Sequence, residues 1–307
     1  MELSVVVPVY NEHEVLPLLR GRLEPVLKQC TDSYEIIFIN DASTDNTWNL
    51  LKKWAAENKN LKAISLSRKF GKEAAMLAGL AASTGKATVL IDADLQDPPE
   101  LIGTFWEKFK QGYEHVYATR QDRSADSFLK RITAGAFYKL YNRLADTPIP
   151  YNAGDFRLLS RRAVEAVLAL PERERFSKGL FAWVGYKSIA VPFVREKRAA
   201  GKTKWNYWQL WNFALGGFTA STTLPLKLWT YFGILISLVS FVFALWTAYK
   251  KIYWGNPVSG YTSIMVAILF FSGVQLITLG VIGEYLSRIF AEVKQRPVYL
   301  IEEKINL

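Results

Sequence analysis

The stretch that decides the fold runs from residue 87 to residue 99 and reads ATVLIDADLQDPP. It opens with a short apolar run, residues 87–91, which is typical of a buried strand. Three acidic residues, Asp92, Asp94 and Asp97, follow at once. Parallel sheets bind their ligands beyond the carboxyl ends of their strands, so this acidic loop is where we expect a ligand.

Three similar runs precede this one and predict further strands of the same sheet. They are residues 4–9, 34–40 and 61–66, and the helical patterns that follow them are 12–28, 43–57 and 71–83. Runs rich in Val and Ile that alternate with helices indicate an α/β fold, with a mostly parallel sheet covered on both faces.

Polar residues also follow the first two predicted strands. Tyr10, Asn11 and Glu12 come after the first, and Asp41 and Ser43 come after the second. Asn, Asp and Ser commonly cap the helix that follows them, so Asp41 has two interpretations, a binding residue or a helix cap.

The acidic loop has two interpretations as well. Like charges so close together are costly unless a cation or hydrogen-bond donors neutralise them. Carboxylate oxygens suit Mg²⁺ or Mn²⁺ held together with substrate phosphates, and the alternative is a solvated turn before Pro98 and Pro99. No GxGxxG follows a predicted strand and no P-loop spacing occurs, so phosphates would depend on metal and basic side chains.

Composition excludes several classes of protein. Of the 307 residues, 50% are hydrophobic, which excludes a disordered chain. The single cysteine, Cys30, excludes an internal disulfide and agrees with a reducing compartment, and two histidines argue against a histidine-rich metal site. The net charge of +10 predicts an anionic partner, which could be nucleic acid, acidic lipid or a phosphorylated substrate.

Two uncharged apolar runs near the C-terminus, residues 229–249 and 261–283, reach the roughly 20 residues that span a bilayer. A short turn joins them, so they predict a transmembrane hairpin rather than two buried core helices. Lys and Arg gather mainly on the two flanks, which predicts that the N-terminal region and both termini are cytoplasmic. Trp205, Trp208 and Trp211 predict an interfacial helix within 205–228, or else an aromatic stripe packed on the soluble domain.

Five segments in order carry a family resemblance. They are VVVPVYNE (5–12), NDASTDNT (40–47), DADLQDPPE (92–100), NAGDFRL (152–158) and RAAGKTKW (198–205). Together they resemble the family 2 glycosyltransferases of GT-A fold, and more narrowly the polyprenyl-phosphate glycosyltransferases, over essentially the whole chain. One departure is Ala153, where the family would have Thr or Ser. The implied organisation is a GT-A catalytic domain (1–204), an interfacial region (205–228), a two-helix hairpin (229–283) and a cytoplasmic juxtamembrane segment (284–307).

The resemblance implies a role for each matching residue. The nucleotide would bind at Pro8, Tyr10, Glu12, Asp41 and Asp92, and Mg²⁺ or Mn²⁺ would bind at Asp92, Asp94 and Gln96. Asp155 would stand by the acceptor as the catalytic base. An acceptor phosphate is mostly dianionic at neutral pH, so Asp155 could instead orient a cation such as Arg157 or bind the sugar.

An acceptor phosphate also needs positive charge close to the membrane. The residues expected to supply it are Arg120, Arg131, Arg198, Lys202 and Lys204. The alternative is a solvated basic face attracted to anionic headgroups.

The implied reaction is the inverting transfer of one sugar from a nucleotide-sugar donor to a polyprenyl phosphate in the bacterial inner membrane. The QxxRW signature of processive synthases is missing from the sequence, which favours a single transfer. Glucose from UDP-glucose is the expected donor sugar, with GDP-mannose and UDP-aminoarabinose as alternatives, and the family suggests a tetramer. A catalytically inactive lipid-binding relative is a second hypothesis. A nucleic-acid-binding protein is disfavoured because no recognised module is present.

Overall fold

The computed structural model describes residues 1–121, 142–143, 147–173, 175, 177–196 and 260–307. It also describes helical positions at 229, 231–236, 238–239, 242–243, 245–246, 249 and 253. Predictions for the 205–228 helix and for Arg131, Arg198, Lys202 and Lys204 lie outside the described residues. The chain forms two compact units, Met1–Gly217 with Arg296–Leu307, and Phe218–Gln295.

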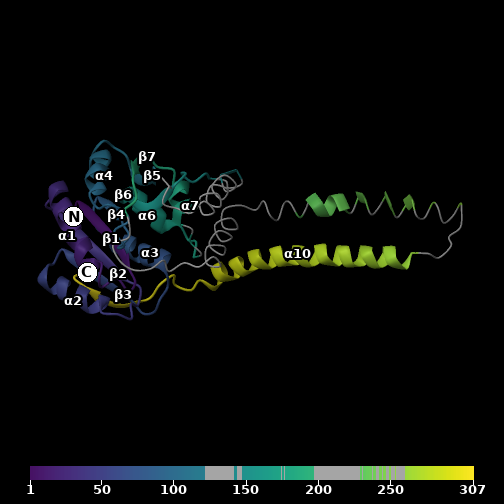
Figure 1. Cartoon of the computed structure of the whole chain (residues 1–307), viewed down its shortest axis with the longest axis horizontal. Helices are drawn as coiled ribbons and strands as arrows, with labels where there is room; N and C mark the ends of the chain where they lie inside the picture. Colours follow the sequence, from purple (N-terminus) through teal and green to yellow (C-terminus); the bar gives the residue numbers. More distant parts are fainter. Residues whose placement is uncertain are drawn as a thin grey trace. The chain divides into compact units, whose positions relative to one another are not determined.

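An eight-stranded mixed sheet is the centre of the first unit, in the order β7-β5-β6-β4-β1-β2-β3-β8 (Figure 1). The strands are β1 Leu3–Val9, β2 Tyr34–Asn40, β3 Leu61–Leu66, β4 Ala87–Leu90, β5 His115–Arg120, β6 Ala153–Ser160, β7 Ser188–Phe193 and β8 Ile301–Ile305. The four neighbours β4, β1, β2 and β3 run parallel, as do β5 and β7, whereas β6 and β8 are antiparallel to their neighbours. The prediction of a mostly parallel α/β sheet is confirmed.

Helices cover both faces of this sheet because its strands are apolar on both sides. The helices are α1 Leu16–Cys30, α2 Thr47–Glu57, α3 Lys72–Ala82, α4 Leu101–Lys110, α6 Arg161–Ala169 and α7 Ser177–Trp183. In β1, Val5 and Val7 pack in a core with α1, α2 and α4. Val6 points the other way, into a core with α3, α6 and α7. This alternation explains the continuous Val-rich run of β1.

Two helices begin four residues later than predicted, at Leu16 and Thr47. The reason is that the preceding loops bind one another. The Asn11 side chain accepts a hydrogen bond from the Thr44 N–H (2.8 Å), and the Asn11 N–H donates to the Ser43 hydroxyl (2.9 Å). Asn11 and Ala42 also have a φ of 53°, which a right-handed helix does not allow.

Strand β8 is a feature that no sequence pattern indicated. It lies within the segment expected to be juxtamembrane, yet it pairs antiparallel with β3 at the edge of the eight-stranded sheet. The side chain of Asn306 donates to the carbonyls of Ala55 and Leu61 (2.6 and 2.9 Å), and the Trp48 indole N–H donates to Glu303 (3.2 Å). The C-terminus therefore covers an edge that would otherwise present unpaired backbone groups.

The second unit contains α10, Tyr261–Lys294, a helix of 34 residues that extends beyond the predicted span of 261–283. Within the part of the chain that the structure describes, Phe270–Lys294 is long and apolar enough to cross a membrane. Its large apolar side chains are exposed, including Leu276 at 69%, which contradicts a buried core helix. The described positions between 229 and 253 are helical too.

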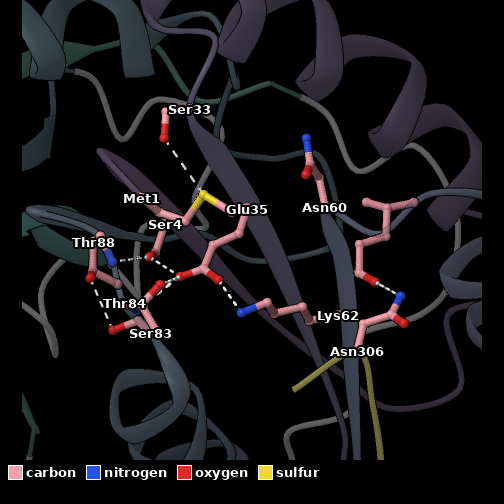
Figure 2. Close-up of polar contacts among 12 residues, drawn as sticks. Met1, Ser4, Ser33, Glu35, Asn60, Lys62, Ser83, Thr84, Thr88 and Asn306 are labelled. Atoms are coloured by element: carbon pink, nitrogen blue, oxygen red, sulfur yellow. Dashed lines mark hydrogen bonds and ion pairs between the residues drawn. The ribbon is translucent and has the colours of Figure 1, made fainter.

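A buried polar cluster lies at the amino ends of the parallel strands, at the opposite edge from the acidic loop. Figure 2 shows its centre, the fully buried Glu35, which accepts hydrogen bonds from the Ser4 hydroxyl (2.5 Å) and from the Thr84 N–H and hydroxyl (2.7 and 2.9 Å). Its other carboxylate oxygen lies 2.6 Å from the ammonium of Lys62. Burial alone raises the pKa of Glu35, but Lys62 and the hydrogen-bond donors outweigh burial and lower it.

Glu35→Ala is expected to destabilise the fold by about 3 kcal/mol, because it leaves Lys62 and several donors without their buried partner. Since the pKa of Glu35 is lower in the folded state, its contribution is present above the ordinary pKa of about 4.3 and is lost as the pH falls through the folded value. Denaturation of the full-length protein in detergent at pH 7 and at a series of pH values below about 4.3 measures both effects. Two results would contradict this role. The first is a loss of unfolding free energy below about 1 kcal/mol at pH 7 in Glu35→Ala. The second is a Glu35→Gln variant that loses as much stability in acid as the wild-type protein does.

Candidate active site

The loops that follow β1, β2, β3 and β4 meet at one edge of the sheet, because these four strands are parallel neighbours. Tyr10 follows β1, and its ring lies 3.6 Å from the ammonium of Lys69, which follows β3. Pro8 and Glu12 flank Tyr10 and are partly exposed. The predicted nucleotide-binding residues at the end of β1 therefore reach the loop that precedes α3.

Asp41 orders that same loop. One of its carboxylate oxygens accepts from the Phe70 N–H (2.7 Å) and the other from the Gly71 N–H (2.9 Å). Gly71 has a φ of +98°, a conformation that favours glycine. Asp41 is 4% exposed, and burial raises its pKa although the two N–H groups counteract this. It binds the residues before α3, so the interpretation that it caps α2, the helix that follows it, is wrong.

Lys72, the first residue of α3, is the centre of the site, and the sequence analysis missed it. Its ammonium lies 2.6 Å from the carboxylate of Asp92 after β4 and 2.5 Å from that of Asp155 on β6. The structure therefore joins the predicted metal residue to the predicted catalytic residue through one cation. The only signal in the sequence was a lysine directly after the loop that follows the third predicted strand.

The ion pair favours the charged forms of Lys72 and Asp155. Burial lowers the pKa of Lys72, but Asp155 and Asp92 outweigh burial and raise it. Burial raises the pKa of Asp155, but Lys72 and Lys178 outweigh it and hold that pKa well below its ordinary value. A carboxylate with a lowered pKa is a weak proton acceptor, so this geometry disfavours Asp155 as a base.

Arg157 lies close enough to Asp155 for its charge to help lower the pKa of that carboxyl. Its guanidinium donates to the carbonyls of Gly154 (2.6 Å) and Asp155 (3.4 Å) and stacks on the ring of Phe181 at 4.1 Å. It is 3% exposed. The cation that pairs with the Asp155 carboxylate is Lys72, and the Arg157 contacts named here hold the backbone of β6.

The acidic loop concentrates negative charge. Asp97 is 7% exposed, and burial together with the charge of Asp92 raises its pKa to about 7. Asp94 accepts from the Gln96 N–H (3.1 Å), and the Gln96 side-chain oxygen accepts from the guanidinium of Arg195. Arg120, at the end of β5, is close enough to lower the pKa of Asp97.

The chemistry of these side chains fits a divalent cation. The described residues contain no cluster of three His, Cys, Asp or Glu that could hold one. However, Mg²⁺ needs only one or two carboxylates when substrate phosphates complete its shell, and Asp92 and Asp94 supply such oxygens. In addition, Oδ1 of Asp155 is buried and has no hydrogen-bond partner among the described residues.

Comparisons with known proteins identify the family of this chain. Residues 4–168 match the model of glycosyl transferase family 2, and residues 224–289 match the GtrB C-terminal hairpin. The chain is 52% identical to an uncharacterized glycosyltransferase of Synechocystis sp., covering 99% of this chain and 95% of the relative. It is 46% identical to the bactoprenol glucosyl transferase of Shigella phage SfX (99% and 100% covered). It is 45% identical to a prophage bactoprenol glucosyl transferase homolog of Escherichia coli (98% and 99% covered).

The family model covers just over half of the chain and includes β1, β2, β4 and β6, which carry the site residues. The hairpin match covers all but the last five residues of the exposed apolar helix α10 and indicates membrane association. The chain belongs to glycosyl transferase family 2 and carries a GtrB C-terminal hairpin.

Proposed function

We propose that this glycosyltransferase moves one glucosyl residue from a nucleotide-sugar donor to the phosphate of a membrane polyprenyl phosphate. The observation that carries the proposal is the meeting of Asp92 and Asp155 at Lys72, which joins the donor side of the site to the acceptor side. Relatives of matching length at 45–46% identity are named bactoprenol glucosyl transferase, which supports both the sugar and the acceptor.

UDP-glucose is the proposed donor, bound with Mg²⁺ or Mn²⁺. Pro8, Tyr10, Glu12 and Asp41 would bind the nucleoside, and Asp92, Asp94 and Gln96 would hold the cation. When bound, the cation would neutralise the diphosphate and stabilise the charge that develops on the leaving group. The crowded carboxylates of the acidic loop and the raised pKa of Asp97 support a cation there.

The acceptor supplies its own nucleophile. A phosphate monoester is mostly dianionic at neutral pH, so one of its oxygens can attack the sugar without losing a proton. A single displacement of this kind inverts the anomeric configuration. Asp155 then serves to orient Lys72, while its buried Oδ1 is available to a sugar hydroxyl. Arg120 and the basic residues outside the described part of the chain would attract the acceptor phosphate.

We also propose a subcellular location and orientation for this protein. The distribution of Lys and Arg around the hairpin supports an inner-membrane protein whose catalytic domain and termini are cytoplasmic. The assembly into tetramers and the four domain boundaries stay predictions.

Arg198→Ala is expected to abolish transfer and to leave membrane association intact, because the hairpin holds the protein in the bilayer while Arg198 serves the acceptor phosphate. Liposome flotation and a transfer assay on the same preparation measure the two properties. Equal loss of both would instead favour a basic face that only binds anionic headgroups.

A donor panel tests the proposed function. Full-length protein is incubated with undecaprenyl phosphate, Mg²⁺ or Mn²⁺, and radiolabelled UDP-glucose, GDP-mannose or UDP-aminoarabinose. We expect label in the organic phase from UDP-glucose. Label from GDP-mannose alone would overturn the choice of glucose, and none from any donor would favour the catalytically inactive relative.

A further inference from the structure

An arginine on α1 joins segments that are far apart in the sequence. The guanidinium of Arg22 donates to both carboxylate oxygens of Glu100 and to both of Glu196, at distances of 2.7–2.9 Å. A planar guanidinium is suited to such bidentate pairs, whereas a lysine is not. The hydrogen bonds that Arg22 donates to Glu196 and Glu100 raise the pKa of Arg22, which keeps it charged.

Both carboxylates belong to segments that adjoin the acidic loop. Glu100 follows the loop directly and precedes α4. The Glu196 N–H donates to the carbonyl of Gln96 (3.1 Å), and the neighbouring Arg195 donates to the Gln96 side-chain oxygen. Arg22 therefore holds residues 195–196 against both the backbone and the side chain of Gln96.

We infer that Arg22 is a positioning residue for the donor site, which acts by holding residues 195–196 on the acidic loop and thereby setting the place of the Gln96 side chain. The inference rests on the proposed function, because Gln96 matters to the reaction only if the acidic loop receives the diphosphate of a nucleotide sugar with its cation. Arg22 acts through Glu196 and Glu100 rather than by contact with the donor.

A stabilising role explains the arrangement less well. The side chains of Glu100 and Glu196 are 53% and 43% exposed, and exposed ion pairs contribute little to folding stability. Removing Arg22 should therefore change the geometry of the acidic loop more than it changes the melting temperature. This difference separates a positioning role from a structural one.

The test uses the full-length protein in nanodiscs and the variants Arg22→Met, Glu196→Gln and the double variant. The matched control is Lys110→Met, which removes another exposed ion pair, with Glu107, from α4. Hydrogen exchange is followed in peptides that cover residues 92–100 and 193–196, and UDP affinity is measured in MnCl₂ by calorimetry.

We expect Arg22→Met to speed exchange in both peptides and to weaken UDP binding at least fivefold, with an unchanged melting temperature. The double variant should bind UDP as well as Arg22→Met does and exchange no faster, because both changes break the same ion pair. UDP affinity within twofold of wild type, or unchanged exchange, would overturn the inference. Failure of the proposed reaction would give a different result. The wild-type protein would bind UDP and the variants would differ from it as described, but the wild-type protein would form no glycolipid.

Discussion

Lys72→Met is expected to lower turnover about 100- to 1,000-fold, the usual cost of removing one electrostatic group from a catalytic site. Lys72 neutralises Asp92 and Asp155 together. Without it, the carboxylate of Asp92 after β4 and that of Asp155 on β6 face each other across the place where a donor diphosphate and an acceptor phosphate must approach. The repulsion raises the energy of the bound state and of the transition state.

The measurement is the rate of lipid-linked product under saturating donor. Lys72→Arg, which keeps the charge but not the shape of the ammonium, should recover part of the activity, and Lys110→Met should stay within twofold of wild type. Because Lys72→Met leaves the largely buried Asp155 without its cation, the melting temperature is measured as well and turnover is expressed per folded protein. Turnover within fivefold of wild type would show that the Lys72 bridge is not part of the reaction.

Asp94→Ala is expected to abolish detectable transfer, a loss of at least about 1,000-fold. The reason is that Asp94 and Asp92 are the two carboxylates that fit the cation, and only one charged ligand from the protein would remain beside Gln96. The matched control is Asp97→Asn on the same loop. Burial and the charge of Asp92 raise the pKa of Asp97 to about 7, so an uncharged side chain resembles a state that it already adopts.

We therefore expect Asp97→Asn to keep at least a tenth of the wild-type rate. Binding of Mn²⁺ with UDP, measured by electron paramagnetic resonance, should be lost in Asp94→Ala and kept in Asp97→Asn. If both variants lost activity equally, the loop would serve as one acidic surface rather than as a site with distinct ligands.

The sequence predicted the sheet and its ligand-binding edge because these depend on local patterns. Val-rich runs between helices define parallel strands, and the ends of parallel neighbours must meet at one edge. Asp41, Asp92 and Asp155 are found there, although 114 residues separate the first from the last.

Other parts could not be predicted, because they arise from contacts between distant segments. The partners of Lys72 lie 20 and 83 positions away, and no periodicity links them. Strand β8 alternates partly buried and exposed residues, and it becomes a strand only by pairing with β3. The sequence position of Arg157 suggested a partner for Asp155, but it could not show that the guanidinium donates to the backbone carbonyls of Gly154 and Asp155 and stacks on the ring of Phe181.

The most direct test of the central claim is mass spectrometry of the lipid formed by the purified full-length protein from UDP-glucose and undecaprenyl phosphate. The account predicts a lipid phosphate that carries a single hexose, released by mild acid and absent with Asp94→Ala. A lipid with several hexoses, or UDP-glucose consumed with no hexose on the lipid phosphate, would contradict it.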